Sequence, residues 1–233
     1  MLPNVIILCG GMGTRLRSVL PDDPKSLAEI GDRAFLDILL EIIFNQGFNR
    51  VILAVGHLKE KIIDKYAEDP RIKFSVEDSP LGTGGAVMNA LHLAETEHVI
   101  VMNGDCLCEV DLKETYEEHK KHKSLITLVL SKSDDISDFG SVRIDEDSRI
   151  TSFKEKVSEK GGGLVSAGIY VFNKEIKNHK PEKNSFSLEH DLFPLLVGGH
   201  FCYGHVISGE FLDIGTPERY ALAKRKFGKK NSK

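Results

Sequence analysis

The chain has 233 residues, of which 41% are hydrophobic and 28% are charged, and its formal charge is −4 at pH 7. These values describe a globular protein with one sizeable core and argue against a basic surface that binds nucleic acid. No apolar segment approaches the roughly 20 residues that cross a bilayer, and Met1 leads into a strand-like run without a cationic leader, so we expect a cytoplasmic protein without membrane contact. The four cysteines (Cys9, Cys106, Cys108 and Cys202) form no CxxC pair, which favours reduced thiols over a zinc site.

Short β-branched runs alternate with longer segments of helical period through the first half of the chain. This alternation predicts an α/β fold with a mostly parallel sheet and helices on both faces. The later third has apolar runs separated by polar turns, which predicts added antiparallel or mixed strands. In chain order the segments are VIIL (5–8), AFLDILLEIIFNQG (34–47), VILAV (51–55), LKEKIIDKYAE (58–68), IKFSV (72–76), GGAVMNALHLAE (84–95), HVIVM (98–102), LKETYEEHKKHK (112–123), SLITLVL (124–130), GSVRI (140–144), RITSFKEK (149–156) and LVSAGIYVF (164–172).

Three polar loops follow predicted strands. GGMGTR comes after the first strand, EDSPLGTGG after the third and NGD after the fourth. Ligands of open α/β sheets gather beyond the carboxyl ends of the strands, so we expect these loops to share one rim. Two segments of the chain are basic. We expect HKKHK (119–123) to be the exposed end of a helix and the tail from 221 to 233 to be a frayed terminus.

The first loop, LCGGMGTRL, fits neither common nucleotide motif. A dinucleotide fingerprint needs a glycine where Leu16 stands, and a Walker loop needs GK followed by serine or threonine. Two interpretations remain: a tight turn with a surface arginine, or a turn whose backbone N–H groups grip a polyphosphate with help from Arg15.

The other motifs also leave two interpretations each. Gly82, Gly84 and Gly85 let a backbone approach a flat base, yet glycines are common at helix starts. Asp105 and Asp213 follow apolar runs and offer the carboxylate oxygens that Mg²⁺ prefers, or they cap turns.

Two further charged motifs are equally open. Glu155 and Lys156 form a reactive pair or a solvated one, and as neighbours on a strand they point to opposite faces unless the backbone bends. Glu189, in LEHDLFP, lies near a binding rim or on a core helix, and the core helix is favoured.

Taken together, the motifs resemble those of the sugar-1-phosphate nucleotidyltransferases. Their signature, GGxGTRL followed after a gap by PK, is present as Gly10–Leu16 and Pro24–Lys25, and the likeness extends through LGTGGA, NGD, FKEK, SAGIY, LEHDLFP and FLDIGTPERY. The resemblance implies a single Rossmann-like, GT-A-like domain over 1–233. Its nucleoside triphosphate (NTP) part would cover about 1–110, its sugar-phosphate part about 111–220 and the basic tail 221–233.

The resemblance also implies the site. Arg15, Lys25 and Lys156 would handle phosphates, and the pair Glu155 and Lys156 would hold the sugar hydroxyls and the sugar phosphate. By the same likeness, the nucleotide would be bound by Leu8, Gly10, Gly11, Gly13, Thr14, Gly82, Thr83 and Gly84. The sugar phosphate would be bound by Gly140, Glu155, Lys156, Ala167 and Gly168. The cofactor Mg²⁺ would be held by Asp105 and Asp213.

In such enzymes a sugar 1-phosphate attacks the NTP α-phosphorus and pyrophosphate departs, without a general base. Within the family, the short length and the DSPLGTGGA loop look most like bacterial D-glycero-D-manno-heptose 1-phosphate guanylyltransferases, which serve surface polysaccharide synthesis. Mannose-1-phosphate guanylyltransferase, N-acetylmuramate-1-phosphate uridylyltransferase and glucose-1-phosphate thymidylyltransferase share the phosphate motifs and stay open. So do a noncatalytic nucleotide-sugar-binding regulatory subunit and a homodimeric state.

Overall fold

A nine-stranded sheet crosses the molecule, and the computed structural model describes it through residues 1–16, 19–137, 139–155, 161–197 and 201–227. Its main path runs β10-β9-β11-β6-β1-β4-β5, and β8 joins β11 to β12. The pairs β5-β4-β1-β6 are parallel, whereas β11 runs antiparallel to β6, β8 and β9. The α/β fold with a mixed sheet flanked by helices is therefore confirmed.

The strands of the main sheet are β1 (Asn4–Leu8), β4 (Val51–Val55), β5 (Ile72–Val76), β6 (His98–Asn103), β8 (Ile126–Ser133), β9 (Gly140–Ile144), β10 (Ile150–Glu155), β11 (Gly163–Asn173) and β12 (Cys202–Ile207). Two short ribbons are β2 (Glu29–Ile30) with β3 (Arg33–Ala34) and β7 (Cys106–Cys108) with β13 (Phe211–Asp213). The helices are α1 (Phe35–Asn45), α2 (Lys59–Tyr66), α3 (Gly82–Ala90), α4 (Leu112–His122), α5 (Phe193–Val197) and α6 (Pro217–Phe227), with 3-10 turns η1 (Thr14–Leu16), η2 (Lys25–Leu27) and η3 (Lys174–His179) and a π-helical turn η4 (Leu188–Leu192).

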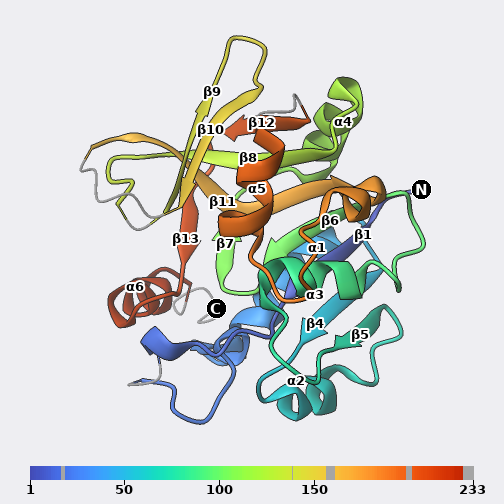
Figure 1. Cartoon of the computed structure of the whole chain (residues 1–233). Helices are drawn as coiled ribbons and strands as arrows, with labels where there is room; N and C mark the ends of the chain where they lie inside the picture. The colour runs from blue at the N-terminus through green and yellow to red at the C-terminus, as the bar shows by residue number, and fades with distance from the viewer. Residues whose placement is uncertain (17–18, 138, 156–160, 198–200, 228–233) are drawn as a thin grey trace.

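The two faces of the sheet bury separate clusters of apolar side chains. Alternation along β1 sends Val5 and Ile7 to the face covered by α1, α2 and α6, while Ile6 faces α3, η4 and α5. All three side chains are fully buried, as expected for a strand covered on both faces. Figure 1 shows β9 and β10 rising at one end of the molecule, with β5 and α2 at the other.

The carboxyl ends of β1, β5 and β6 open on one rim, as the strand order predicts. Leu8 at the end of β1 pairs with Asn103 at the end of β6. The loop after β6 is fastened back to β1 because the Gly104 N–H donates to the Leu8 carbonyl at 3.0 Å. The three sequence loops therefore meet around the end of one central strand.

Two expectations about basic segments need correction. Residues 221–227 continue α6 instead of starting a frayed tail, because Tyr220 and Ala223, three residues apart, both face the core. The segment 228–233 lies outside the described residues. The run HKKHK does end a helix with its three lysines exposed, as expected, but its first residue, His119, is fully buried. The His119 ring lies 3.1 Å from His98, 2.9 Å from the Thr127 hydroxyl and 3.0 Å from the Ser124 hydroxyl.

This buried histidine makes folding sensitive to acid. Burial lowers the pKa of His119 from 6.5 to about 3, and the nearby His98 acts in the same direction. Between these values the unfolded chain binds a proton that the folded chain does not, so stability is complete above pH 6.5 and falls as the pH drops toward 3. We expect His119 to lower the unfolding free energy by about 1 kcal/mol between pH 7.5 and 5.5.

Chemical denaturation at these two pH values measures the loss. His119→Gln, which does not titrate, is expected to lose less stability on acidification than the wild type, and the exposed His92→Gln is the control. An equal acid loss in His119→Gln and the wild type would contradict the assignment.

Candidate active site

Three adjoining hollows form a trough along the rim. We name them the β5 hollow (about 550 Å³), the central hollow (about 280 Å³) and the β11 hollow (about 150 Å³). Leu8, Gly11 and Thr83 line both the β5 and the central hollow. Arg15, Asn103 and Asp105 line both the central and the β11 hollow, so the three spaces are continuous.

Each hollow has its own chemistry. The β5 hollow is lined by glycines and by the segment Glu77–Pro80 that follows β5. The central hollow has the cations of Arg15 and Lys25 beside the backbone of Gly11 and Gly13. The β11 hollow is the most polar in its lining, which consists of Arg15, Asn103, Asp105, Cys106, Phe139, Gly140, Glu155, Ser166, Gly168, Tyr170, Glu189, Phe211, Asp213 and Arg219.

Two carboxylates lie where the central and β11 hollows meet, and each is bonded to a cation. Lys25 Nζ contacts Asp105 Oδ2, and Arg219 Nη1 lies 3.0 Å from Asp213 Oδ2. The β7–β13 ribbon brings the acids together: Asp213 pairs with Cys106 in register, and the Ile214 N–H donates to the Asp105 carbonyl at 2.9 Å. The predicted pair of aspartates therefore shares one corner, although 108 residues separate them in sequence.

This corner supplies two of the oxygen ligands that a hard divalent cation needs, and the others would come from water and substrate. Carboxylate oxygens are the ligands that Mg²⁺ prefers, and it completes its octahedron with water and substrate phosphates. Within the residues that the structure describes, no group of three or more His, Cys, Asp or Glu side chains is assembled for a metal. Two aspartates beside a phosphate-sized space thus fit a magnesium ion that shares its ligands with a bound substrate.

The thiols near the site are protonated at neutral pH. Burial raises the pKa of Cys9 to about 12, and burial with the nearby Asp105 and Asp213 carboxylates raises the pKa of Cys106 well above its usual value. All four cysteines are free and buried, which agrees with the expected reduced thiols and leaves no thiolate nucleophile at this rim.

Most residues named from the sequence line the trough, but some do not. The hollows include Leu8, Gly10, Gly11, Gly13, Arg15, Lys25, Gly82, Thr83, Asp105, Gly140, Glu155, Gly168 and Asp213. Thr14 begins the turn η1, and Lys156 lies outside the described residues.

Ala167 and Gly84 serve packing instead. Period-two alternation on β11 turns Ser166, Gly168 and Tyr170 toward the β11 hollow and Ala167 into the core on the opposite face. Gly84 is needed because a Cβ there would lie 2.2 Å from the Phe186 ring, so its missing side chain makes room for a core aromatic. The expected contacts of Ala167 with a sugar and of Gly84 with a nucleotide have no support in this geometry.

Several polar residues in the trough carried no site role in the sequence analysis, among them Glu77, Asn103, Tyr170 and Arg219. The Asn103 Oδ1 atom is buried and has no hydrogen-bond partner among the described residues. Gly168 makes room for this side chain, since it has a left-handed φ of 70° and a Cβ there would lie 2.8 Å from Asn103 Nδ2. The motifs NGD and SAGIY contained these residues, but only the pairing of β6 with β11 shows that they meet.

Glu189 lies beside the β11 hollow and not in the core, contrary to the favoured interpretation of LEHDLFP. Its carboxylate accepts hydrogen bonds from the hydroxyls of Thr83 (2.9 Å), Ser187 (2.8 Å) and Tyr170 (3.3 Å). Thr83 in turn accepts the Leu188 N–H at 2.8 Å. This carboxylate therefore ties the start of α3, at the β5 hollow, to the lining of the β11 hollow.

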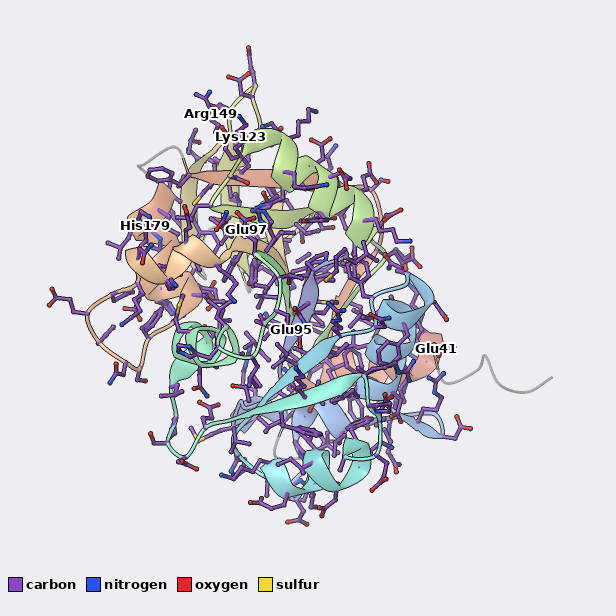
Figure 2. All side chains as sticks on the ribbon, turned by 90° about the vertical axis from the view of Figure 1, so that its right-hand side faces the viewer. Glu41, Glu95, Glu97, Lys123, Arg149 and His179 are labelled. Atoms are coloured by element: carbon purple, nitrogen blue, oxygen red, sulfur yellow. The ribbon has the colours of Figure 1, made fainter. Side chains whose placement is uncertain are left out.

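The opposite rim, at the amino ends of the strands, has a different character. Figure 2 faces this side and labels Glu95 and Glu97 just ahead of β6. Its hollow of about 300 Å³ is lined by Arg50, Lys73 and Glu95, and Glu95 pairs with Lys73 at 2.7 Å and with Arg50 at 3.7 Å. Ion pairs are thus present at both rims, but the glycine-rich loops and the paired aspartates lie only at the rim of the trough among the described residues.

Comparison with known proteins identifies the family. The profile of the nucleotidyl transferase family matches residues 4–230. D-glycero-alpha-D-manno-heptose 1-phosphate guanylyltransferase of Campylobacter jejuni is 39% identical over 93% of this chain and 96% of its own length. The protein of the same name from Aneurinibacillus thermoaerophilus is 36% identical over 95% of this chain and 97% of its own. The chain belongs to the nucleotidyl transferase family, within its class of sugar-1-phosphate nucleotidyltransferases.

Solved structures agree with this assignment. HddC from Yersinia pseudotuberculosis superposes with a TM-score of 0.86 at 37% identity, covering 97% of this chain and all of the other. The same protein complexed with GMP-PN gives a TM-score of 0.84. The family has thus been seen with a nucleotide on a chain of closely similar fold.

None of the described helices is long and apolar enough to cross a membrane.

Gly11 offers a test of the trough that separates folding from binding. A Cβ at Gly11 would meet nothing within 4 Å, whereas one at Gly10 would lie 2.2 Å from Glu77 Oε1. Gly11→Ala should therefore keep the wild-type Tm but weaken NTP binding at least tenfold, because its methyl group enters both hollows. Gly10→Ala should lower the Tm. Thermal unfolding and calorimetric titration with each of the four NTPs measure both effects, and unchanged NTP affinity in Gly11→Ala would place the nucleotide elsewhere.

Proposed function

We propose that the enzyme transfers GMP from GTP to D-glycero-D-manno-heptose 1-phosphate and releases pyrophosphate. The observation that carries the proposal is the continuous trough, whose β5, central and β11 hollows would receive the base, the phosphates and the sugar in order. The two full-length relatives named for this activity support the choice of sugar and base. The GMP-PN complex of a related chain supports a guanine nucleotide.

Bond making and breaking would occur where the central and β11 hollows meet. An oxygen of the sugar 1-phosphate forms a bond to the α-phosphorus of GTP, while the bond from that phosphorus to the bridging oxygen breaks and pyrophosphate leaves with the electron pair. The attacking phosphate is already anionic near neutral pH, so no side chain has to remove a proton. The main obstacle is repulsion between two anions, which fixed cations and amides relieve.

The side chains at this corner would divide that task. Arg15 would hold the β- and γ-phosphates together with the backbone N–H groups of the glycine loop, and Lys25 would hold the phosphates nearer the reacting centre. Asp105 and Asp213 would hold Mg²⁺, which supplies charge compensation on the phosphate oxygens when bound. Lys156 is assigned to the sugar phosphate and Glu155 to the sugar hydroxyls by resemblance alone.

Glu77 is our candidate for recognising guanine. Its Oε2 accepts the Leu81 N–H at 2.9 Å, and its Oε1 has no hydrogen-bond partner among the described residues. The side chain lines the β5 hollow and is half-buried, which raises the pKa of its carboxyl. Gly10 and Gly56 make room for it, since a Cβ at either would lie within 2.6 Å of Oε1. A carboxylate suits guanine, which presents N–H donors at N1 and N2, better than uracil or thymine, which present one donor.

Pyrophosphate release from each of the four NTPs with a panel of sugar 1-phosphates tests the proposed reaction. GTP with D-glycero-D-manno-heptose 1-phosphate should give the highest kcat/KM, and chelation of Mg²⁺ should abolish turnover.

Arg15→Ala should reduce the rate about 10²- to 10³-fold, because it removes a positioned charge. Lys120→Ala, on the outer face of α4, is the control that should leave the rate unchanged. Preference for mannose 1-phosphate, or for UTP or dTTP, would replace the proposed substrates, and binding without turnover would favour the regulatory alternative.

Glu77→Gln tests base recognition separately. The amide offers only one acceptor oxygen, so kcat/KM for GTP should fall about 100-fold, while the poorer use of UTP should change little. Glu60→Gln, an exposed acid on α2, is the matched control. An equal loss with all NTPs would show that Glu77 supports the loop and does not read the base.

A further inference from the structure

Arg219 is a cation of the β11 hollow to which neither the family signature nor the comparisons give a role. It lies in the first turn of α6, two residues after Pro217, and lines the β11 hollow together with Arg15. Its guanidinium carbon lies 4.6 Å from the centre of the Phe139 ring, and Nη1 lies 3.0 Å from Asp213 Oδ2. An aromatic ring and a carboxylate thus hold the guanidinium at the corner where the reaction is proposed.

The bond to Asp213 places Arg219 in competition with a metal. Asp213 is only 9% exposed, and its Oδ1 already accepts the Gly215 N–H at 2.7 Å. A divalent cation on Oδ2 would therefore have to share or replace the guanidinium. The same relation holds for Lys25 on Asp105, so each predicted metal ligand is bonded to a cation that could otherwise bind phosphate.

The surroundings of Gly215 show how close these groups are. A Cβ at Gly215 would lie 2.5 Å from Asp213 Oδ1, 3.4 Å from Lys25 Nζ and 3.7 Å from Arg15 Nη2. The cations of Arg15, Lys25 and Arg219 therefore surround two carboxylates within one small volume. A phosphate monoester brought here needs donors on the side of the β11 hollow, and Arg219 is the described cation on that side besides Arg15.

We propose that Arg219 binds the phosphate of the sugar 1-phosphate in exchange for its bond with Asp213, whose carboxylate would then be available to hold Mg²⁺. The inference rests on the proposed function for its substrate class. The planar fork of guanidinium matches phosphate oxygens, and the Phe139 ring beside the guanidinium holds it next to the β11 hollow. Binding of the sugar phosphate and binding of the metal would then favour each other, because Arg219 leaves Asp213 Oδ2 open when it binds the phosphate.

Arg219→Met tests both halves of the exchange. Methionine keeps an apolar stem for Phe139 but removes the charge, so KM for the sugar 1-phosphate should rise about 10- to 100-fold while KM for GTP stays within a factor of two or so. Mn²⁺, an ion that also prefers oxygen ligands, should bind the substrate-free variant about 3- to 10-fold more tightly than the wild type in a paramagnetic resonance titration, since a competing cation is gone.

Arg225→Met, on the exposed face of the same helix, is the matched control and should change neither quantity. Arg219→Lys should restore part of the sugar 1-phosphate KM, because it keeps the charge without the planar fork. A residue that only braces Asp213 would give the opposite metal result, so weaker Mn²⁺ binding in Arg219→Met, or an unchanged KM for the sugar 1-phosphate, overturns the proposal. The Mn²⁺ titration uses no substrate, and it stands if the sugar or base proposed above proves wrong.

Discussion

The site depends on the balance of charge at one corner of the rim. Asp105 and Asp213 are bonded to Lys25 and Arg219, and Arg15 lies close by. In a partly dehydrated pocket, unpaired charges of either sign would be costly, so acids and bases stabilise one another there. The same arrangement suits anionic reactants that bind with a metal ion, because phosphate groups can pair with the cations of the corner and the metal ion can pair with its carboxylates.

The fold supplies this corner from distant parts of the chain. Parallel strands β1 and β6 end together, and the small β7–β13 ribbon lays the second aspartate against the first. Arg219 follows on the first turn of α6, which is held to the sheet by Tyr220 and Ala223. The core packing of a terminal helix thus determines the position of a charged side chain in the trough.

Close packing also connects the two ends of the trough. The Thr83–Glu189 hydrogen bond joins the helix at the β5 hollow to the turn at the β11 hollow, and Gly84 is free of a side chain so that Phe186 can pack between them. The β5 hollow and the β11 hollow are therefore linked through one carboxylate that accepts hydrogen bonds from three hydroxyl groups. Such a link suits an enzyme that must align two substrates before they react.

The sequence by itself determined the fold class and the shared rim of the three loops, and most of the residues it singled out line that rim. The fold class and the shared rim follow from the alternation of strand and helix patterns along the chain, whereas the site residues were named from motifs that resemble those of the family. It could not decide that Ala167 faces the core while Ser166 and Gly168 face the trough, that Gly84 serves Phe186, or that Glu189 lies in the site. It also gave no sign that Glu77, Asn103 and Arg219 line the same trough. Those outcomes belong to the tertiary structure, because they depend on which strand pairs with which, in what register, and on contacts between side chains that are far apart in the chain.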